Sequence, residues 1–185
     1  MFKKFETKEL VLVALFASLA FSIAFFVGSW LATLTGIGLM PSIINAIFVG
    51  AIFSFLCLTI KKFWTATMAM TIYSLLAIPT VLFGYPGAYK IIPAVLGGLT
   101  FDSLNSIFGY RKKGYYLGWD LCLLVMFIFL VIFYILLGLP GKDKLIGALP
   151  IVILVALSTG LIGVWLGIFL FEKIKNKHFI KQFRK

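Results

Sequence analysis

Long uninterrupted apolar runs, separated by short polar or charged segments, form the main pattern of this chain. From Leu10 to Ile60 there is no Asp, Glu, Lys, Arg or His. A helix needs about 20 apolar residues to cross the hydrocarbon of a bilayer, so this stretch alone is long enough for two spans. The runs are continuously apolar, whereas the strands of a membrane β-barrel alternate apolar and polar side chains. The pattern therefore predicts membrane helices.

The order of the apolar runs predicts six helical spans in a single domain. Pro41 suits the first turn of the second span, and the Pro-Gly pair in GYPGAYK marks a turn before the fourth. The predicted fold class is an all-α integral membrane protein, built as a bundle of six transmembrane helices. The expected spans are 8–28, 41–60, 63–83, 88–108, 118–138 and 145–171, followed by a basic tail over 172–185.

Composition agrees with a membrane protein and charge gives its orientation. The chain is 62% hydrophobic and 12% charged, whereas soluble domains carry roughly 25% charged residues. Fourteen of the 17 Lys and Arg residues lie at the chain ends or in the loops after the second and fourth spans. The positive-inside rule then places both termini in the cytoplasm of a multi-pass cell-membrane protein. The basic tail is expected to contact anionic lipid head groups, and no nucleic-acid partner is expected.

The sequence lacks the motifs of the common catalytic sites. The single histidine, His178, lies in the basic tail, so neither the HExxH zinc motif nor a base for a serine nucleophile is present. Cys57 and Cys122 have no metal-binding spacing. Only Asp102 and Asp120 are candidates for a pair of catalytic carboxylates, and there is no nucleotide-binding glycine loop. We therefore expect no enzyme activity, no cofactor and no metal.

A few polar and aromatic side chains in the outer halves of the spans are candidate ligand contacts. The amide of Asn45 needs a partner in lipid, either a ligand or another helix. Lys90, flanked by Tyr85 and Tyr89, could hold an anionic or carbonyl-bearing ligand, or could simply lie at the membrane interface. Trp30 has the same two interpretations. The remaining candidates of this kind are Tyr73 and Tyr134.

The fourth span contains a carboxylate, which costs several kcal/mol in a membrane helix unless it meets water or a partner. Asn105 lies one turn from this residue, Asp102, on the same face. Gly97 and Gly98 allow a neighbouring helix to approach closely. Asp102 is therefore either a ligand contact, with a polar network behind the site, or an interhelical hydrogen bond that locks the bundle. Trp64, Trp119 and Trp165 are expected to be interface or packing residues.

Small residues recur along the first span at spacings of three and four, which places them on one narrow helix face. Small residues let helices approach closely in lipid. This face could pack inside the bundle, or it could be the docking surface for another membrane subunit, in which case it faces outward. It consists of Ala17, Ala20, Ala24 and Gly28.

In these features the chain resembles the substrate-binding S components of energy-coupling factor (ECF) vitamin transporters. The opening TKELVLVALFASLAFSIAFF is similar to the first helix of that family, whose AxxxA pattern matches Ala20 and Ala24. The uncharged, glycine-rich first outer loop and the GGLTFD sequence of the fourth span also agree. The resemblance extends over essentially the whole chain.

The resemblance implies that the chain captures a vitamin or precursor and works with a transmembrane coupling subunit and two ABC ATPases. The alanine pattern would dock on the coupling subunit, and the first outer loop, about 29–40, would gate the ligand. The GGLTFD pattern resembles the branch proposed to carry thiamine or its hydroxymethylpyrimidine precursor, although the outer loops lack an acidic partner for thiamine's cation. Ligand contacts are then expected among Trp30, Asn45, Tyr73, Tyr85, Tyr89, Lys90, Asp102 and Tyr134.

Three other functions remain open on the sequence alone. A self-sufficient small transporter or channel would need polar stripes along a continuous pore, and this chain has few polar residues in its spans. An intramembrane enzyme would depend on one of the two carboxylates. A structural or assembly factor would need neither a ligand nor partners for transport.

Overall fold

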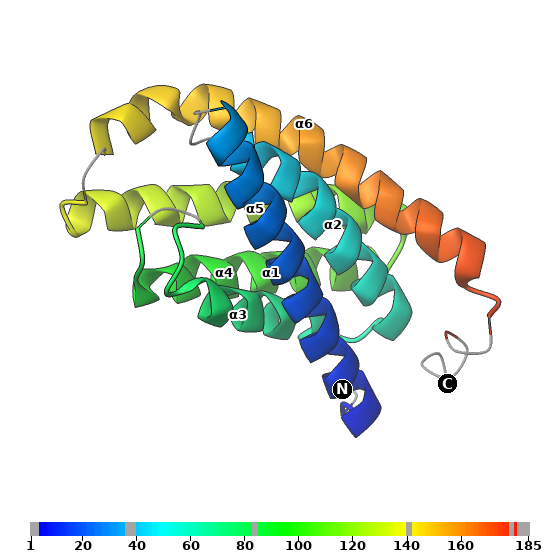
Figure 1. The fold of residues 1–185 in the computed structure, drawn as a ribbon. Helices are drawn as coiled ribbons and strands as arrows, with labels where there is room; N and C mark the ends of the chain where they lie inside the picture. Colours follow the sequence, from blue (N-terminus) through cyan, green and yellow to red (C-terminus); the bar gives the residue numbers. More distant parts are fainter. Residues whose placement is uncertain (1–3, 36–39, 83–84, 140–141, 178–179, 181–185) are drawn as a thin grey trace.

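The structure, a computed structural model, describes residues 4–35, 40–82, 85–139, 142–177 and 180. Within these residues the chain is all helical, with six α-helices, one short 3₁₀ helix and no strand. In chain order (Figure 1) the elements are α1 (Thr7–Thr35), α2 (Met40–Ile60), α3 (Thr65–Ala77), η1 (Ala88–Lys90), α4 (Ile91–Ile107), α5 (Lys112–Leu136) and α6 (Lys142–Ile174).

Each of the six predicted spans corresponds to one helix, so the all-α fold class is confirmed. Three helical segments are long and apolar enough to cross a membrane, judged by length and composition: Thr7–Gly28, Lys112–Leu136 and Leu149–Ile174. Three boundaries were predicted wrongly. α5 begins at Lys112, before the expected start at residue 118. α1 continues past Gly28 to Thr35, because a single glycine is tolerated inside a helix. α3 ends at Ala77, well before the expected residue 83, because Pro79 has no backbone N–H to continue the helix.

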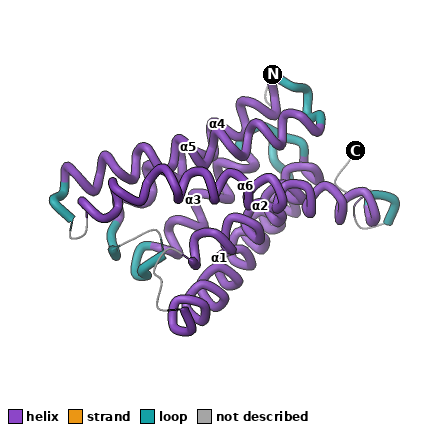
Figure 2. Tube along the Cα trace, turned by 90° about the horizontal axis from the view of Figure 1, so that it is seen from above, coloured by secondary structure: helices purple, strands orange, loops and turns teal. Residues whose placement is uncertain are grey.

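The helices form a closed ring rather than a simple up-and-down stack. Going around it, α1 packs on α2, α2 on α6, α6 on α5, α5 on α4, α4 on α3, and α3 again on α1. Figures 1 and 2 show α4 and α5 running side by side, with α1 and α2 crossing their direction. The ring thus places α6, the last helix of the chain, between α2 and α5.

Glycines bring neighbouring helices to backbone contact at two crossings. On α6, a Cβ at Gly163 would collide with the carbonyl oxygen of Ile47, and one at Gly167 would lie 2.5 Å from that of Ala51. On α4, a Cβ at Gly98 would lie 2.6 Å from the Cα of Thr67. The predicted close approach at Gly97 and Gly98 is therefore confirmed, whereas the closer α2–α6 crossing was not anticipated from the sequence.

The small-residue face of α1 lies inside the bundle. Ala17, Ala20 and Ala24 have no exposed surface, and Gly28 is also buried. α1 packs against α2 and α3, so these residues serve close helix packing. The prediction that this face points outward to dock a partner is wrong for this structure. The opposite face of α1 is exposed and carries Leu15, Leu19, Phe26 and Trp30.

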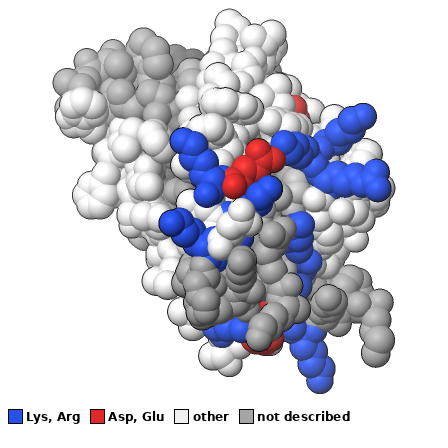
Figure 3. Space-filling model, turned by 90° about the vertical axis from the view of Figure 1, so that its right-hand side faces the viewer, with Lys and Arg blue, Asp and Glu red and all other residues white. Residues whose placement is uncertain are grey.

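Basic residues gather at one end of the ring. Figure 3, which views the right-hand side of Figure 1, shows Lys and Arg side chains around a few acidic ones. Two ion pairs join the elements that meet there: Lys112 of α5 lies 2.6 Å from Glu172 of α6, and Lys62 lies 2.6 Å from Glu9 of α1. We call this the basic end. It collects the start of α1, the α2–α3 and α4–α5 connections, and the end of α6.

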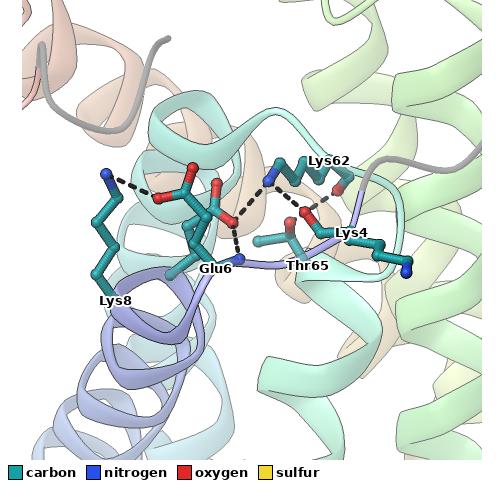
Figure 4. A network of polar contacts seen from close by, with 6 residues as sticks. Lys4, Glu6, Lys8, Lys62 and Thr65 are labelled. Carbon is teal, nitrogen blue, oxygen red and sulfur yellow. Dashed lines mark hydrogen bonds and ion pairs between the residues drawn. The ribbon is translucent and has the colours of Figure 1, made fainter.

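The Glu9–Lys62 pair also caps the N-terminus of α1 (Figure 4). The Glu9 carboxylate accepts the backbone N–H of Glu6 at 2.7 Å, the half of a capping box in which the third helical residue reaches back to the N-cap. Lys62 Nζ donates both to Glu9 and to the carbonyl oxygen of Lys4, at 2.6 and 2.7 Å. The Glu9 side chain is only 4% exposed. The pair therefore ties α1 to the α2–α3 connection.

Replacing Lys62 with methionine should destabilise the fold by about 3 kcal/mol, because removing one partner leaves a buried charge without compensation. Reversible unfolding in detergent would measure this loss. Lys112→Met is the matched control, since both side chains of the Lys112–Glu172 pair are largely exposed and such pairs contribute little. Equal stability of the Lys62→Met and Lys112→Met variants would contradict this assignment.

Candidate functional site

A cavity lies inside the helix ring and is bounded by five of the six helices. Its volume is about 40 Å³, counted as the space open to the centre of a water-sized sphere. None of the described residues around it is charged. Its wall is formed by Asn45, Ala46, Val49 and Phe53 of α2, Met70 and Tyr73 of α3, Ala94 of α4, Trp119, Leu123, Met126 and Phe127 of α5, and Ala156 of α6.

The cavity is small in this state but has adaptable walls. About 10–15 Å³ by the same measure holds one water molecule, so the free space suits a few waters. A single-ring ligand needs more room, and Met70 and Met126 are the side chains best able to provide it. Methionine is unbranched and flexible, and it fills irregular space without a fixed shape. The cavity can therefore enlarge without moving a helix.

Asn45 supplies a polar group to an otherwise apolar wall. It lies in the second turn of α2 and is 6% exposed. Among the described residues its Oδ1 atom has no hydrogen-bond donor. A buried acceptor left in this state costs about 1–3 kcal/mol, which a ligand carrying a donor would recover. The structure thus places this predicted residue at the cavity.

Tyr73 is the second predicted residue that the structure brings to the cavity. It is 3% exposed, and its ring packs edge-on against Phe53 of α2 at 6.0 Å and Phe21 of α1 at 6.1 Å. Phe53 in turn meets the indole of Trp119 edge-on at 6.2 Å. Such edge-to-face pairs favour fixed ring positions. One side of the cavity is therefore a connected aromatic wall.

Trp119 is a cavity residue that sequence reasoning treated only as an interface or packing residue. It is 1% exposed, and a Cβ at Gly50 or Gly160 would lie 3.0 or 2.8 Å from its Nε1 atom. The indole therefore occupies space that two glycines, on α2 and α6, leave free. In the described part of the chain its Nε1 has no acceptor. The sequence signal was the pair of glycines in two apolar spans, which is informative only once their helices are known to be neighbours.

Lys90 does not contact the cavity. Its side chain is 3% exposed, and Nζ donates to the carbonyl oxygens of Ala77 and Thr80 at 3.0 and 2.6 Å. These carbonyls lie at and just beyond the end of α3, where helix carbonyls have no partner in the helix. In this structure the Lys90 ammonium is therefore engaged by backbone carbonyls and not by the cavity. Lys90 is buried and caps α3.

Lys90→Met should therefore destabilise the fold and leave the cavity intact. Hydrogen bonds to charged groups contribute about 1.5–3 kcal/mol each, so the loss of two should cost at least about 3 kcal/mol. Thermal unfolding in detergent would measure the loss. Lys113→Met, which removes an exposed lysine, is the control. Unchanged stability of Lys90→Met would contradict the capping role.

The tyrosines at the end of the bundle opposite the basic end form a cluster of their own, away from the cavity wall. Tyr89 Oη donates to the carbonyl oxygen of Tyr85 at 2.8 Å, and the Tyr85 backbone N–H donates to Tyr134 Oη at 3.3 Å. The rings of Tyr89 and Tyr134 lie 6.2 Å apart. This cluster fastens the start of η1 to the end of α5. The three residues were predicted as ligand contacts, and in this structure none of them lines the cavity.

Two further predictions concern the first outer loop. Trp30 lies on α1 with 64% of its surface exposed and does not line the cavity, because α1 is longer than expected. The proposed gate over 29–40 overlaps the α1 and α2 helices, and residues 36–39 lie outside the described residues. A gating role for this segment stays a prediction.

Asp102 forms the interhelical lock that was one of its two predicted roles. Its carboxylate accepts the backbone N–H of Ala66 at 3.1 Å, and the backbone N–H and hydroxyl of Thr67 at 2.9 and 2.7 Å. These groups belong to the first turn of α3, so a residue of α4 caps another helix and complements its dipole. Asp102 does not line the cavity, and the ligand-contact alternative is wrong in this structure.

The chemistry of the site follows from its own residues. Across the described residues, no group of three or more His, Cys, Asp or Glu side chains is placed to hold a metal ion. A scan against protein-family models and searches of curated proteins and of solved structures found no match to this chain. What the structure offers is an uncharged, mostly apolar space inside a helix ring, with aromatic walls and one buried acceptor that lacks a donor.

Proposed function

We propose that this chain is the substrate-binding subunit of an ECF-type importer. It binds a small planar heterocycle, of the thiamine or hydroxymethylpyrimidine kind, and delivers it together with a transmembrane coupling subunit and two ABC ATPases. The observation that carries the proposal is the cavity among α2 to α6, with its aromatic wall and the unpaired Asn45 acceptor. Ligand pockets are commonly of this kind, apolar with a few placed polar groups.

The position of the cavity in the ring fits capture from outside. Under the positive-inside rule the basic end faces the cytoplasm. Asn45 and Ala94 lie near the starts of α2 and α4, and both helices run from there toward connections at the basic end. The cavity therefore extends from the half of the bundle remote from the basic end to the middle of the bundle, where it reaches Trp119 of α5. A ligand would enter from the opposite, outer side.

The proposal requires a docking surface other than the one first expected. The alanine face of α1 is buried in the chain's own core, so a coupling subunit would have to contact a different surface. α1 and α6 both present exposed apolar side chains, among them Leu15 and Phe26 on α1 and Ile151 and Trp165 on α6. Lipid covers any part of these faces that no partner occupies.

Transport by purified components tests this function. The chain should bind radiolabelled hydroxymethylpyrimidine without ATP, but should accumulate it in proteoliposomes only together with a coupling subunit and ATPases. A module with inactive ATPases is the control. Uptake by the chain alone would instead show a self-sufficient transporter, and conversion of the ligand would show an enzyme. Either result would contradict the proposal.

A further inference from the structure

The described residues that form the wall of the cavity carry no charge to match a charged ligand. Lys90, which directly precedes α4, gives its hydrogen bonds to Ala77 and Thr80. The carboxylate of Asp102 is held by the first turn of α3. Neither residue lines the cavity, and neither does Asp120. An ion placed in the cavity would therefore lose its hydration without gaining a counter-charge.

The size of the cavity also favours a small ligand. Its free volume of about 40 Å³ holds only a few waters. Met126 already fills the space beside Gly97, where a Cβ would lie 2.6 Å from its Cγ, so the cavity does not widen in that direction. Trp119 cannot retreat, because Gly50 and Gly160 enclose its indole. The space therefore suits one ring better than two linked rings.

Asn45 sets the polar requirement. Its Oδ1 is buried and, among the described residues, accepts no hydrogen bond. An amide oxygen is only an acceptor, so the complementary ligand group is a donor such as an amino, ring N–H or hydroxyl group. Sites built around such a buried group discriminate strongly against analogues that leave it unpaired.

We infer that the ligand of this cavity is an uncharged, single-ring compound whose N–H or O–H donor meets Asn45, and that the site rejects organic cations. The inference rests on the proposed function and narrows its substrate class. Of the two compounds that the resemblance suggests, the cavity selects the neutral pyrimidine over thiamine. Burying an unpaired charge costs far more than burying a neutral ring.

The two compounds form a matched pair for the test, because thiamine carries the same aminopyrimidine linked to a permanently charged thiazolium. Binding of each to the purified full-length chain in nanodiscs would be measured by calorimetry at a pH where the pyrimidine is neutral. We expect the amino-substituted hydroxymethylpyrimidine to bind at least about tenfold more tightly than thiamine. Equal or tighter binding of thiamine would overturn the inference and leave the proposed function standing.

A second comparison tests the role of Asn45. Hydroxymethylpyrimidine without its amino group should bind about tenfold to a hundredfold more weakly, since about 1.4 kcal/mol corresponds to tenfold. Asn45→Ala should abolish this difference between the two pyrimidines. Ser54→Ala is the matched control, because it removes another buried, unpaired oxygen of α2 that does not line the cavity. An unchanged preference for the amino compound in Asn45→Ala would overturn the assigned contact.

Asn45→Asp keeps the side-chain shape and adds a negative charge. It should strengthen binding of thiamine relative to the neutral pyrimidine. No binding of either pyrimidine or thiamine to folded wild-type chain would overturn the inference. Transport of a different compound in the proteoliposome assay would then still support the importer function, so the two proposals fail separately.

Discussion

Replacing Gly163 with leucine should abolish recovery of folded protein. At this point α6 meets the backbone of α2, and a Cβ on Gly163 would collide with the carbonyl oxygen of Ile47 and lie 3.0 Å from that of Ala46. A backbone carbonyl cannot rotate away as a flexible side chain can. Overpacking a core typically costs about 1–3 kcal/mol and occasionally more. Here α6 has to move away from α2 along their whole contact, so we expect Gly163→Leu to cost more than about 3 kcal/mol.

A graded series on the same helix makes the result specific. Gly163→Ala should lower the free energy of unfolding by about 2–3 kcal/mol, while Gly163→Leu should give only aggregated material in size-exclusion chromatography. Gly147→Leu is the control, since no atom of the described residues lies within 4 Å of the position of its Cβ. Equal yields and unfolding midpoints for Gly163→Leu and Gly147→Leu would show that the helices do not meet as the structure has them.

Asp102→Ala should destabilise the fold by at least about 3 kcal/mol, without direct loss of a ligand contact. The change leaves two backbone N–H groups and the Thr67 hydroxyl without their acceptor. Each buried group left unsatisfied costs about 1–3 kcal/mol. Asp102→Asn should fall between Asp102→Ala and the wild type, because one amide oxygen can still accept a hydrogen bond from the first turn of α3.

The readout is the free energy of unfolding together with ligand affinity of the folded fraction. Asp120→Ala is the matched carboxylate control, because Asp120 Oδ1 has no donor among the described residues and its removal should cost little. Affinity should be unchanged in folded Asp102→Asn, since Asp102 does not line the cavity. A large loss of affinity at unchanged stability would return Asp102 to the ligand site.

The sequence predicted the helices well because hydrophobic runs report membrane helices directly. It predicted their ends less well. The early end of α3 is marked in the sequence by Pro79, but the partner of its last carbonyls is not: Lys90 Nζ bonds to Ala77 and Thr80 from ten or more residues away. Nothing in the local pattern around Ala77 shows that such a partner exists. Contacts of this kind are tertiary, and a single sequence does not display them.

The candidate site was predicted in part for a related reason. Periodicity correctly grouped Ala17, Ala20 and Ala24 on one face of α1. It could not show whether that face points into the bundle or away from it, because this depends on which helices lie next to α1. Asn45 and Tyr73 were found because a polar atom in an apolar span has to be paired or used. Trp119 was missed because its buried position depends on the space left by glycines of two other helices, Gly50 and Gly160.

The order of helices around the ring has a consequence for biosynthesis. α6 emerges last from the ribosome, yet it fills the place between α2 and α5. Until it arrives, the Ile47 and Ala51 carbonyls and the Trp119 indole have no cover on that side. Until α6 is inserted, lipid or an insertion factor must therefore cover the surfaces of α2 and α5 that α6 will contact. A chain truncated before α6 would lack part of the cavity wall however well its first five helices insert.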